Sequence, residues 1–195
     1  FNNPGITAND AFKPVTRYFD RITRPEQIIQ SFPAAVQTML DPADCGPACI
    51  ALSQDIQGQT FDYPEEFFKE RVHAIRRPRP DEFQIKEAAE KIKSSKNPII
   101  ISGGGVFYSD AMEELSQFAI KHNIPVTQTV MGYSTMKRDH SHFAGQIGGL
   151  GGKNTNTLAK ETDLAIAVGT KLADFTTGSW ANFENENFKL VSINV

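Results

Sequence analysis

The chain has 195 residues, a formal net charge of −3 at pH 7, and 39% hydrophobic and 22% charged residues. This composition is typical of a globular protein and excludes a disordered tail. The negative net charge provides no global positive field for nucleic acid or a membrane surface, and no apolar run approaches the roughly 20 residues that span a bilayer. The two cysteines are too few for a disulfide framework and suit the reducing cytoplasm, where we expect the protein.

Prolines and glycines divide the chain into two unlike regions. Nine of the 11 prolines lie within residues 1–80, whereas 11 of the 14 glycines lie within residues 103–178. We place the change of character near residue 82.

The first region begins with polar residues and scattered aromatics over 1–22, where we expect irregular or short elements. Thr23 and Glu26 then fit a capping box, with Pro25 in the first turn of the helix. Apolar residues follow at helical spacing, so the pattern predicts a helix over 24–40.

The rest of this region contains little regular pattern. The apolar run at 49–52 predicts one buried strand, whose neighbours either lie in the second region or are missing. Residues 56–82 are rich in proline and predict a stiff, extended linker. Cys45 and Cys49 do not complete a zinc site, because no His or Cys pair lies near them, and we expect no metal-ligating residues.

The second region alternates between apolar runs and amphipathic stretches. Strands are predicted at 99–101, 125–130, 164–168 and 190–193. Helices are predicted from 83 onward, after a Ser109 cap up to Asn123, and at 154–162. This alternation predicts an α/β fold, a Rossmann-like parallel sheet with helices on both faces.

Glycines follow several of the predicted strands and suggest a ligand site. Glycine lets a ligand approach the backbone closely, and ligands of open α/β sheets bind at the carboxyl edge of the strands. The alternative is a set of tight turns packed against another domain. The candidate cofactor-binding residues on this rim are Gly103, Gly104, Gly105, Gly148, Gly149, Gly169 and Thr170.

Familiar catalytic motifs are missing from the sequence. It contains no dinucleotide fingerprint, no P-loop and no G-x-S-x-G nucleophile elbow. His140 and His142 flank Ser141, but the sequence places no third group to orient either ring, so we expect a surface loop rather than a catalytic pair.

Two stretches resemble the thiamine-diphosphate-dependent enzymes. The segment GPACIALSQDI at 46–56 resembles the strand that closes their pyrimidine-binding domain, with Ser53 where the family usually has proline. Residues 98–195 resemble their Rossmann-like central domain, as in acetolactate synthase, through PIIISGGG at 98–105 and DLAIAVG at 163–169.

A closer resemblance is to one group within this family, the trihydroxycyclohexanedione hydrolases of myo-inositol catabolism. It rests on RITRPEQ at 21–27, DPADCGP at 41–47, IRRPRP at 75–80 and DFTTGSW at 174–180. The resemblance implies hydrolytic C–C cleavage of a cyclic diketone, a small-molecule substrate, with thiamine diphosphate and Mg²⁺.

The resemblance also implies a domain plan. Residues 1–55 correspond to the end of the pyrimidine-binding domain, 56–82 to a linker, and 83–195 to a central domain truncated at its C-terminus. The family's activating glutamate and its Gly-Asp-Gly motif belong to segments outside this sequence, which contains no Gly-Asp-Gly. We therefore expect an interior fragment that is inactive by itself, has no catalytic residue, binds no cofactor and forms a homo-oligomer.

Two alternatives remain open. One is a fragment of an acetolactate-synthase-like carboligase with FAD in the central domain. The other is a free-standing nucleotide-binding or scaffolding module.

Overall fold

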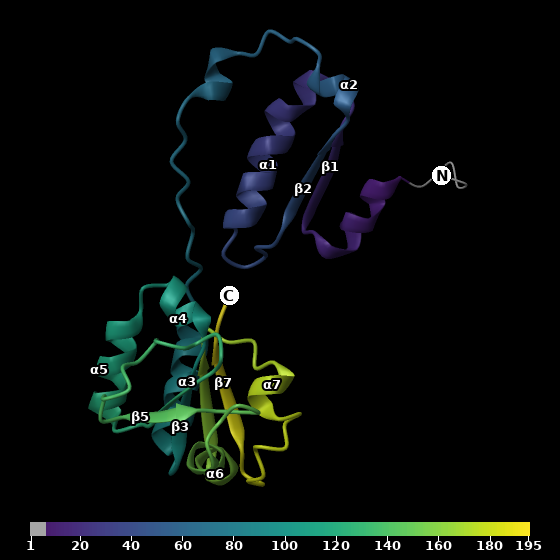
Figure 1. Ribbon diagram of the computed structural model, residues 1–195. Coiled ribbons are helices and arrows are strands. Elements are labelled where there is room, and N and C mark those ends of the chain that lie inside the picture. The colour runs from purple at the N-terminus through teal and green to yellow at the C-terminus, as the bar shows by residue number, and fades with distance from the viewer. Residues whose placement is uncertain (1–6) are drawn as a thin grey trace. The chain divides into compact units, whose positions relative to one another are not determined.

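The computed structural model describes residues 7–195, and the chain divides into two compact units between Pro78 and Arg79 (Figure 1). Each unit is described by itself. None of the helices within 7–195 is both long and apolar enough to cross a bilayer.

Unit 1 is built on a parallel pair of strands connected by a helix. The strands β1 (Tyr18–Ile22) and β2 (Ala48–Leu52) pair in register from Tyr18 with Ala48 to Ile22 with Leu52, and helix α1 (Ile28–Leu40) packs against both. The neighbour of the strand predicted at 49–52 thus lies in residues 1–22, where we expected irregular or short elements, and not in the second region. The strand is also less buried than predicted, since within 48–52 only Ala51 is buried. The remaining elements of the unit are η1 (Ala8–Val15), η2 (Pro25–Gln27), α2 (Gln54–Gln57) and η3 (Glu65–Phe68).

The predicted helix near residue 24 begins as expected but is capped by another side chain. Gln27, not Glu26, reaches back, and its Oε1 accepts hydrogen bonds from the N–H groups of Thr23 (2.7 Å) and Arg24 (2.9 Å). A short 3-10 turn, η2, then leads into α1. The capping box was wrong by one residue because the 3-10 turn changes which side chain lies beneath the free N–H groups.

Unit 2 is a five-stranded sheet in which every pair of neighbouring strands is parallel, as predicted (Figure 1). The strand order is β5-β4-β3-β6-β7. The strands are β3 (Pro98–Ser102), β4 (Val126–Gln128), β5 (Phe143–Gln146), β6 (Leu164–Val168) and β7 (Lys189–Ile193). The helices are α3 (Glu82–Ser94), α4 (Gly104–Tyr108), α5 (Met112–His122), α6 (Lys153–Glu161) and α7 (Asp174–Thr177).

Alternating side chains of the central strands fill two separate cores. On one face Ile100 and Ile166 pack with Leu115 and Ala119 of α5 and with Ile92 of α3. On the other face the cluster contains residues of β3, β6 and α6, namely Ile99, Ile101, Ala165, Ala167 and Ala159. Both faces are thus covered, which explains why these strands read as unbroken apolar runs.

The structure corrects two details of the prediction for unit 2. Strand β5 was not predicted, because Gly145 lies within it at a φ of 103° and the segment reads as a loop. Ser109 does not cap α5, which follows Ala111 without a side-chain cap; Ser109 instead ends the short helix α4.

Candidate functional site

The strand order of unit 2 defines where a ligand site is expected. From β3 the chain proceeds outward through β4 to β5, and β6 then returns to the other side of β3. The carboxyl ends of β3 and β6 therefore flank the point at which the direction of winding reverses. Ligands of open α/β sheets bind at this point.

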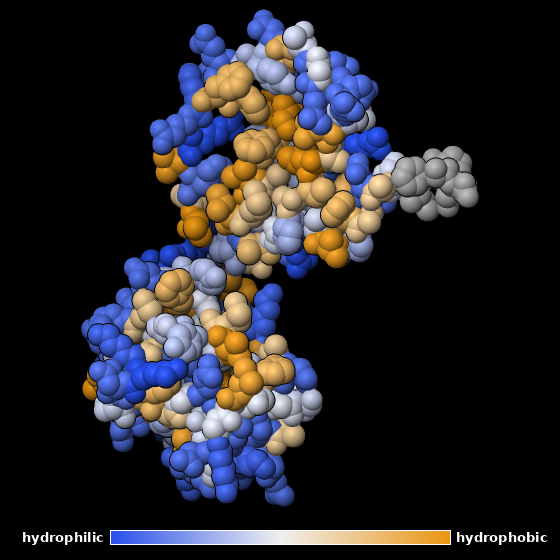
Figure 2. Space-filling view, viewed as in Figure 1, coloured by the Kyte–Doolittle hydropathy of each residue, from blue (hydrophilic) through white to orange (hydrophobic). Residues whose placement is uncertain are grey.

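A cleft of about 520 Å³ lies at this point. Its walls come from the segments that follow β3, β4 and β6 and from α7, and Figure 2 shows apolar surface over the region between α4 and α7. A volume of this size suits a small organic molecule. The residues that line the cleft are Gly104, Gly105, Tyr108, Thr129, Val130, Met131, Leu150, Gly169, Thr170, Lys171, Ala173, Phe175 and Thr176.

The lining is mostly apolar and carries little reactive chemistry. Met131 and Phe175 are 73% and 60% exposed, although both are large hydrophobic residues. Lys171 is the one charged residue among those that line the cleft, and the threonines add hydroxyl groups. The lining contains no Asp, Glu, His or Cys, so Lys171 and Tyr108 are its side chains of the kinds that act as general acids or bases, and the cleft is suited mainly to binding and orienting a ligand.

The rim glycines after β3 and β6 allow the two loops to pack closely against each other beside the cleft. The N–H of Gly105 donates to the carbonyl of Gly169 (2.9 Å), and Gly169 has a φ of 60°. A Cβ on Gly103 would lie 2.4 Å from the carbonyl oxygen of Gly169, and a Cβ on Gly105 would lie 2.6 Å from its Cα. The two loops therefore need glycine in order to pack backbone against backbone.

Gly148 and Gly149 lie behind the wall of the cleft rather than in its lining. The N–H of Gly149 donates to the carbonyl of Phe175 (2.9 Å), and a Cβ on Gly148 would lie 2.2 Å from the same oxygen. The side chain of Asn156 bonds both backbone groups of Gly148. These glycines fix the backbone that carries the Phe175 ring.

The structure thus divides the seven predicted rim residues into two sets. Gly104, Gly105, Gly169 and Thr170 line the cleft, whereas Gly103, Gly148 and Gly149 do not. The sequence reasoning missed the apolar walls, although Phe175 lies in the segment 174–180 that carried the family resemblance.

A buried polar network fastens the wall that follows β4. The side-chain amide of Gln128 donates to the carbonyl of Met136 (3.0 Å) and to Thr135 Oγ1 (3.2 Å), and Thr135 also bonds Ser102 Oγ (2.6 Å). Gln128, Thr135 and Ser102 are all at most 2% exposed. The network holds residues 129–136, and with them Val130 and Met131, in place.

Replacing Gln128 with leucine should therefore lower the free energy of unfolding by about 1–3 kcal/mol, because the Met136 carbonyl loses its buried donor. Hydrogen exchange over 129–136 should accelerate. Gln146 is the partner of Gln128 in β5, and no side-chain hydrogen bond of Gln146 is present among residues 7–195, so Gln146→Leu is the matched control. Equal losses in the two variants would contradict this role of the network.

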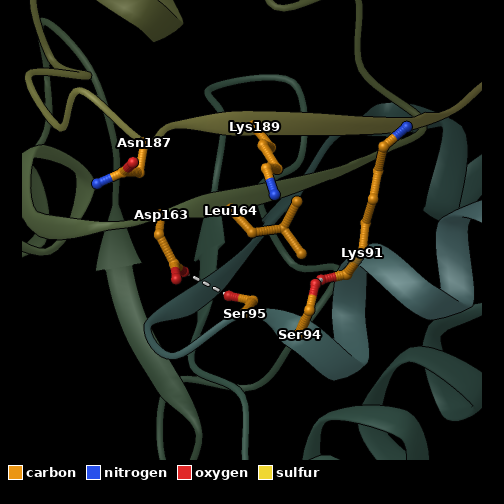
Figure 3. A pocket seen from close by; sticks show the side chains of 7 residues that line it. All are labelled: Lys91, Ser94, Ser95, Asp163, Leu164, Asn187 and Lys189. Carbon is orange, nitrogen blue, oxygen red and sulfur yellow. Dashed lines mark hydrogen bonds between the residues drawn. The ribbon is translucent and has the colours of Figure 1, made fainter.

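A smaller hollow of about 70 Å³ lies at the opposite, amino-terminal edge of the sheet (Figure 3). There the Asp163 carboxylate accepts hydrogen bonds from the Ser95 hydroxyl and from the N–H groups of Lys96 (2.8 Å) and Asn97 (3.0 Å). Burial raises the pKa of Asp163, but these hydrogen bonds outweigh it and hold the pKa below its ordinary value. Asp163 thus joins the turn before β3 to the start of β6, which is a structural role.

Comparison with known proteins identifies the family. Residues 85–195 match the family model described as the central domain of thiamine pyrophosphate enzymes. The chain is 49% identical over 193 residues to a Clostridium perfringens (strain 13 / Type A) protein and 47% identical over 193 residues to a Bacillus subtilis (strain 168) protein. Both relatives are named 3D-(3,5/4)-trihydroxycyclohexane-1,2-dione hydrolase.

The matches cover 99% and 97% of this chain, respectively, but 30% of each relative. The chain therefore spans about 30% of the length of the curated relatives that it matches. It belongs to the thiamine pyrophosphate enzymes, and residues 85–195 are their central domain.

Proposed function

We propose that this chain is an internal part of a thiamine-diphosphate-dependent hydrolase that cleaves a C–C bond of a cyclic diketone, trihydroxycyclohexanedione, in inositol catabolism. The observation that carries the proposal is the extent of the likeness to the relatives of that name. Identity of 46–49% continues over 193 residues, so it includes unit 1 as well as the central domain that the whole family shares.

The proposed domain plan assigns residues 1–55 to the end of the pyrimidine-binding domain, 56–82 to a linker and 83–195 to the central domain. The family match from residue 85 and the division into two compact units between Pro78 and Arg79 support this plan. Between 58 and 81 regular structure is limited to the single turn η3, as suits a connecting segment.

Thiamine diphosphate and Mg²⁺ are proposed for the complete enzyme, not for these residues. The donor set here does not fit a magnesium-bound diphosphate: no carboxylate lines the cleft, and within 7–195 no three His, Cys, Asp or Glu side chains lie close enough together to hold a metal ion. We assign no step of the cleavage to this chain. Its proposed role in a cytoplasmic homo-oligomer is to shape the substrate pocket and to hold subunits together.

Gly104, Gly105, Gly169 and Thr170 are proposed to contact whichever ligand occupies the cleft. The position of the cleft at the winding reversal favours one second candidate function, a carboligase of the acetolactate synthase type with FAD bound there. The mostly apolar lining, with Lys171 as its charged side chain, is compatible with either ligand.

The test is turnover of the cyclic diketone by the complete purified protein, followed by mass spectrometry of the ring-opened product. We expect product only when thiamine diphosphate and Mg²⁺ are supplied. A flavin absorbance band together with carboligation of pyruvate would favour the second candidate. If the complete protein shows neither activity and binds no cofactor, that result would instead indicate a scaffolding module.

The 195-residue chain alone provides a separate prediction. Calorimetric titration with thiamine diphosphate and Mg²⁺ should give no binding heat, because the residues that would hold the diphosphate are expected elsewhere in the complete enzyme. A stoichiometric site of micromolar affinity in this chain would contradict the proposal that the residues that hold the diphosphate lie elsewhere in the complete enzyme.

A further inference from the structure

Two histidines attach the loop before β5 to helix α5. The Nε2 of His140 lies 3.0 Å from Ser116 Oγ on α5, and its Nδ1 accepts the backbone N–H of His142 at 3.1 Å. The Nε2 of His142 lies 3.1 Å from the Oδ1 of Asn123, the residue that ends α5, and its Nδ1 lies 2.9 Å from Ser141 Oγ. Contrary to the expectation from sequence, both rings are therefore oriented by residues distant along the chain.

These contacts require the His140 ring to be neutral and place a proton on the Nε2 of both rings. A backbone N–H can only donate, so the Nδ1 of His140 carries no proton and its Nε2 donates to Ser116. An amide oxygen can only accept, so the Nε2 of His142 carries a proton, whereas its Nδ1 can either accept from or donate to the Ser141 hydroxyl. Because His140 presents a protonated Nε2 to Ser116, it cannot act as a base toward that hydroxyl.

We propose that His140 and His142 form a latch between loop 137–142 and α5 that protons release. A proton on the Nδ1 of His140 would face the N–H of His142, and two imidazolium rings whose centroids are 5.7 Å apart would repel each other. The latch is closed when His140 is neutral, and its opening takes up a proton on that ring. Its stability therefore falls as the pH falls through the range of about 5–8 in which imidazoles change charge.

The release should be confined to one part of the connection between β4 and β5. Residues 129–136 are held by the buried network of Gln128, Thr135 and Ser102, none of which titrates. Residues 137–146 depend on the latch and on the pairing of β5, an edge strand of the sheet. Acid should therefore loosen 137–146 and leave the cleft wall at 129–136 intact.

Few other groups can produce the same pH dependence. Strands β4 and β5 contain no charged residue, and imidazole is the side chain that ordinarily titrates between pH 5 and 8. The other imidazole nearby is His122, whose ring contacts Phe118 with centroids 4.5 Å apart. The charged or titratable residues on the loop, on α5 and on α6, which packs on β5, are Lys137, Arg138, Asp139, Glu113, Glu114, Lys121, His122, Lys153, Lys160 and Glu161.

The test is hydrogen exchange of the complete protein at pH 7.5 and pH 5.5, with rates corrected for the intrinsic effect of pH. We expect protection over 137–146 to fall by about tenfold for each pH unit in which one ring takes up its proton. Protection over 129–136 should stay unchanged. Equal protection over 137–146 at the two pH values, or an equal loss over both segments, would overturn the latch.

Variants separate the latch from general acid sensitivity. His140→Gln keeps an acceptor for the His142 N–H and a donor for Ser116 but does not titrate, so the pH dependence over 137–146 should disappear. His122→Gln, the control on α5, should leave it unchanged; the reverse pattern would overturn the proposal. Should the variant at 140 fail to fold, ¹⁵N spectra of the wild-type imidazoles still decide, because the latch requires the neutral Nε2–H tautomer of His140 at pH 7.5.

Discussion

Replacing Gly103 with alanine should lower the free energy of unfolding of unit 2 by about 3 kcal/mol. This is the upper end of the loss that is usual when an extra carbon atom is inserted into a well-packed site. The new Cβ would lie 2.4 Å from the carbonyl oxygen of Gly169 and 2.8 Å from the Cα of Thr170. Both are backbone atoms, which cannot move aside without separating the loops after β3 and β6. Denaturant unfolding of the complete protein, followed by a signal from unit 2, measures the loss.

Gly152→Ala is the matched control for this prediction. Gly152 precedes α6 with a φ of −69°, and a Cβ there would meet no atom within 4 Å. Its replacement should change the free energy of unfolding by no more than about 1 kcal/mol, the usual range for an N-cap residue. Similar losses at 103 and 152 would contradict the close packing of the two loops.

Replacing Asp163 with alanine should produce the second large loss of stability, about 3 kcal/mol. Without the carboxylate, the Ser95 hydroxyl and the N–H groups of Lys96 and Asn97 lose their shared acceptor, and hydrogen bonds to a charged group contribute more than neutral ones. Asp163→Asn keeps one acceptor oxygen and should lose less. Thermal unfolding at pH 7 ranks the two variants.

The pH dependence of this effect has a definite sign. Because the pKa of Asp163 is lowered in the folded protein, its carboxylate stabilises the fold at pH values above the ordinary aspartate range. This stabilisation is lost as the pH falls below about 4 and through the folded pKa. The difference in stability between wild type and Asp163→Asn should therefore shrink below pH 4; a constant difference would indicate that charge is not involved.

The centre of the sheet could be predicted because its strands are buried on both faces. Residues 99–101 and 164–168 are unbroken apolar runs, and each is followed by glycine at the carboxyl edge. A run of this kind between two amphipathic helices has few alternatives to a parallel strand. The fold class followed from these two segments, which also place glycines at the carboxyl edge of the sheet.

The peripheral strands could not be predicted in the same way. Strand β1 contains the exposed Arg21 and, on the opposite face, Asp20, which accepts a hydrogen bond from the buried Ser31 of α1, so its sequence has no unbroken apolar run. Strand β5 has four residues, one of them a glycine with positive φ. Such strands are determined by the neighbour with which they pair, and a single sequence does not show that neighbour.

The glycines at the candidate site show the same limit of prediction from a single sequence. The sequence places glycines at the edge where ligands bind, but it cannot separate those that admit a ligand from those that admit a second backbone. Gly103 and Gly104 are adjacent, yet a Cβ on Gly103 would meet Gly169 and one on Gly104 would meet the carbonyl of Met131 beside the cleft. That distinction depends on loops that only the folded sheet brings together.

The central position of β3 also constrains the order of events during synthesis on the ribosome. Ile100 pairs with Val126 on one side and with Ile166 on the other. The first partner leaves the exit tunnel soon after β3, whereas the second follows only after the whole segment through α6 has been translated. During that interval the nascent chain exposes one edge of this apolar strand, which is the stage at which chaperones should bind this domain.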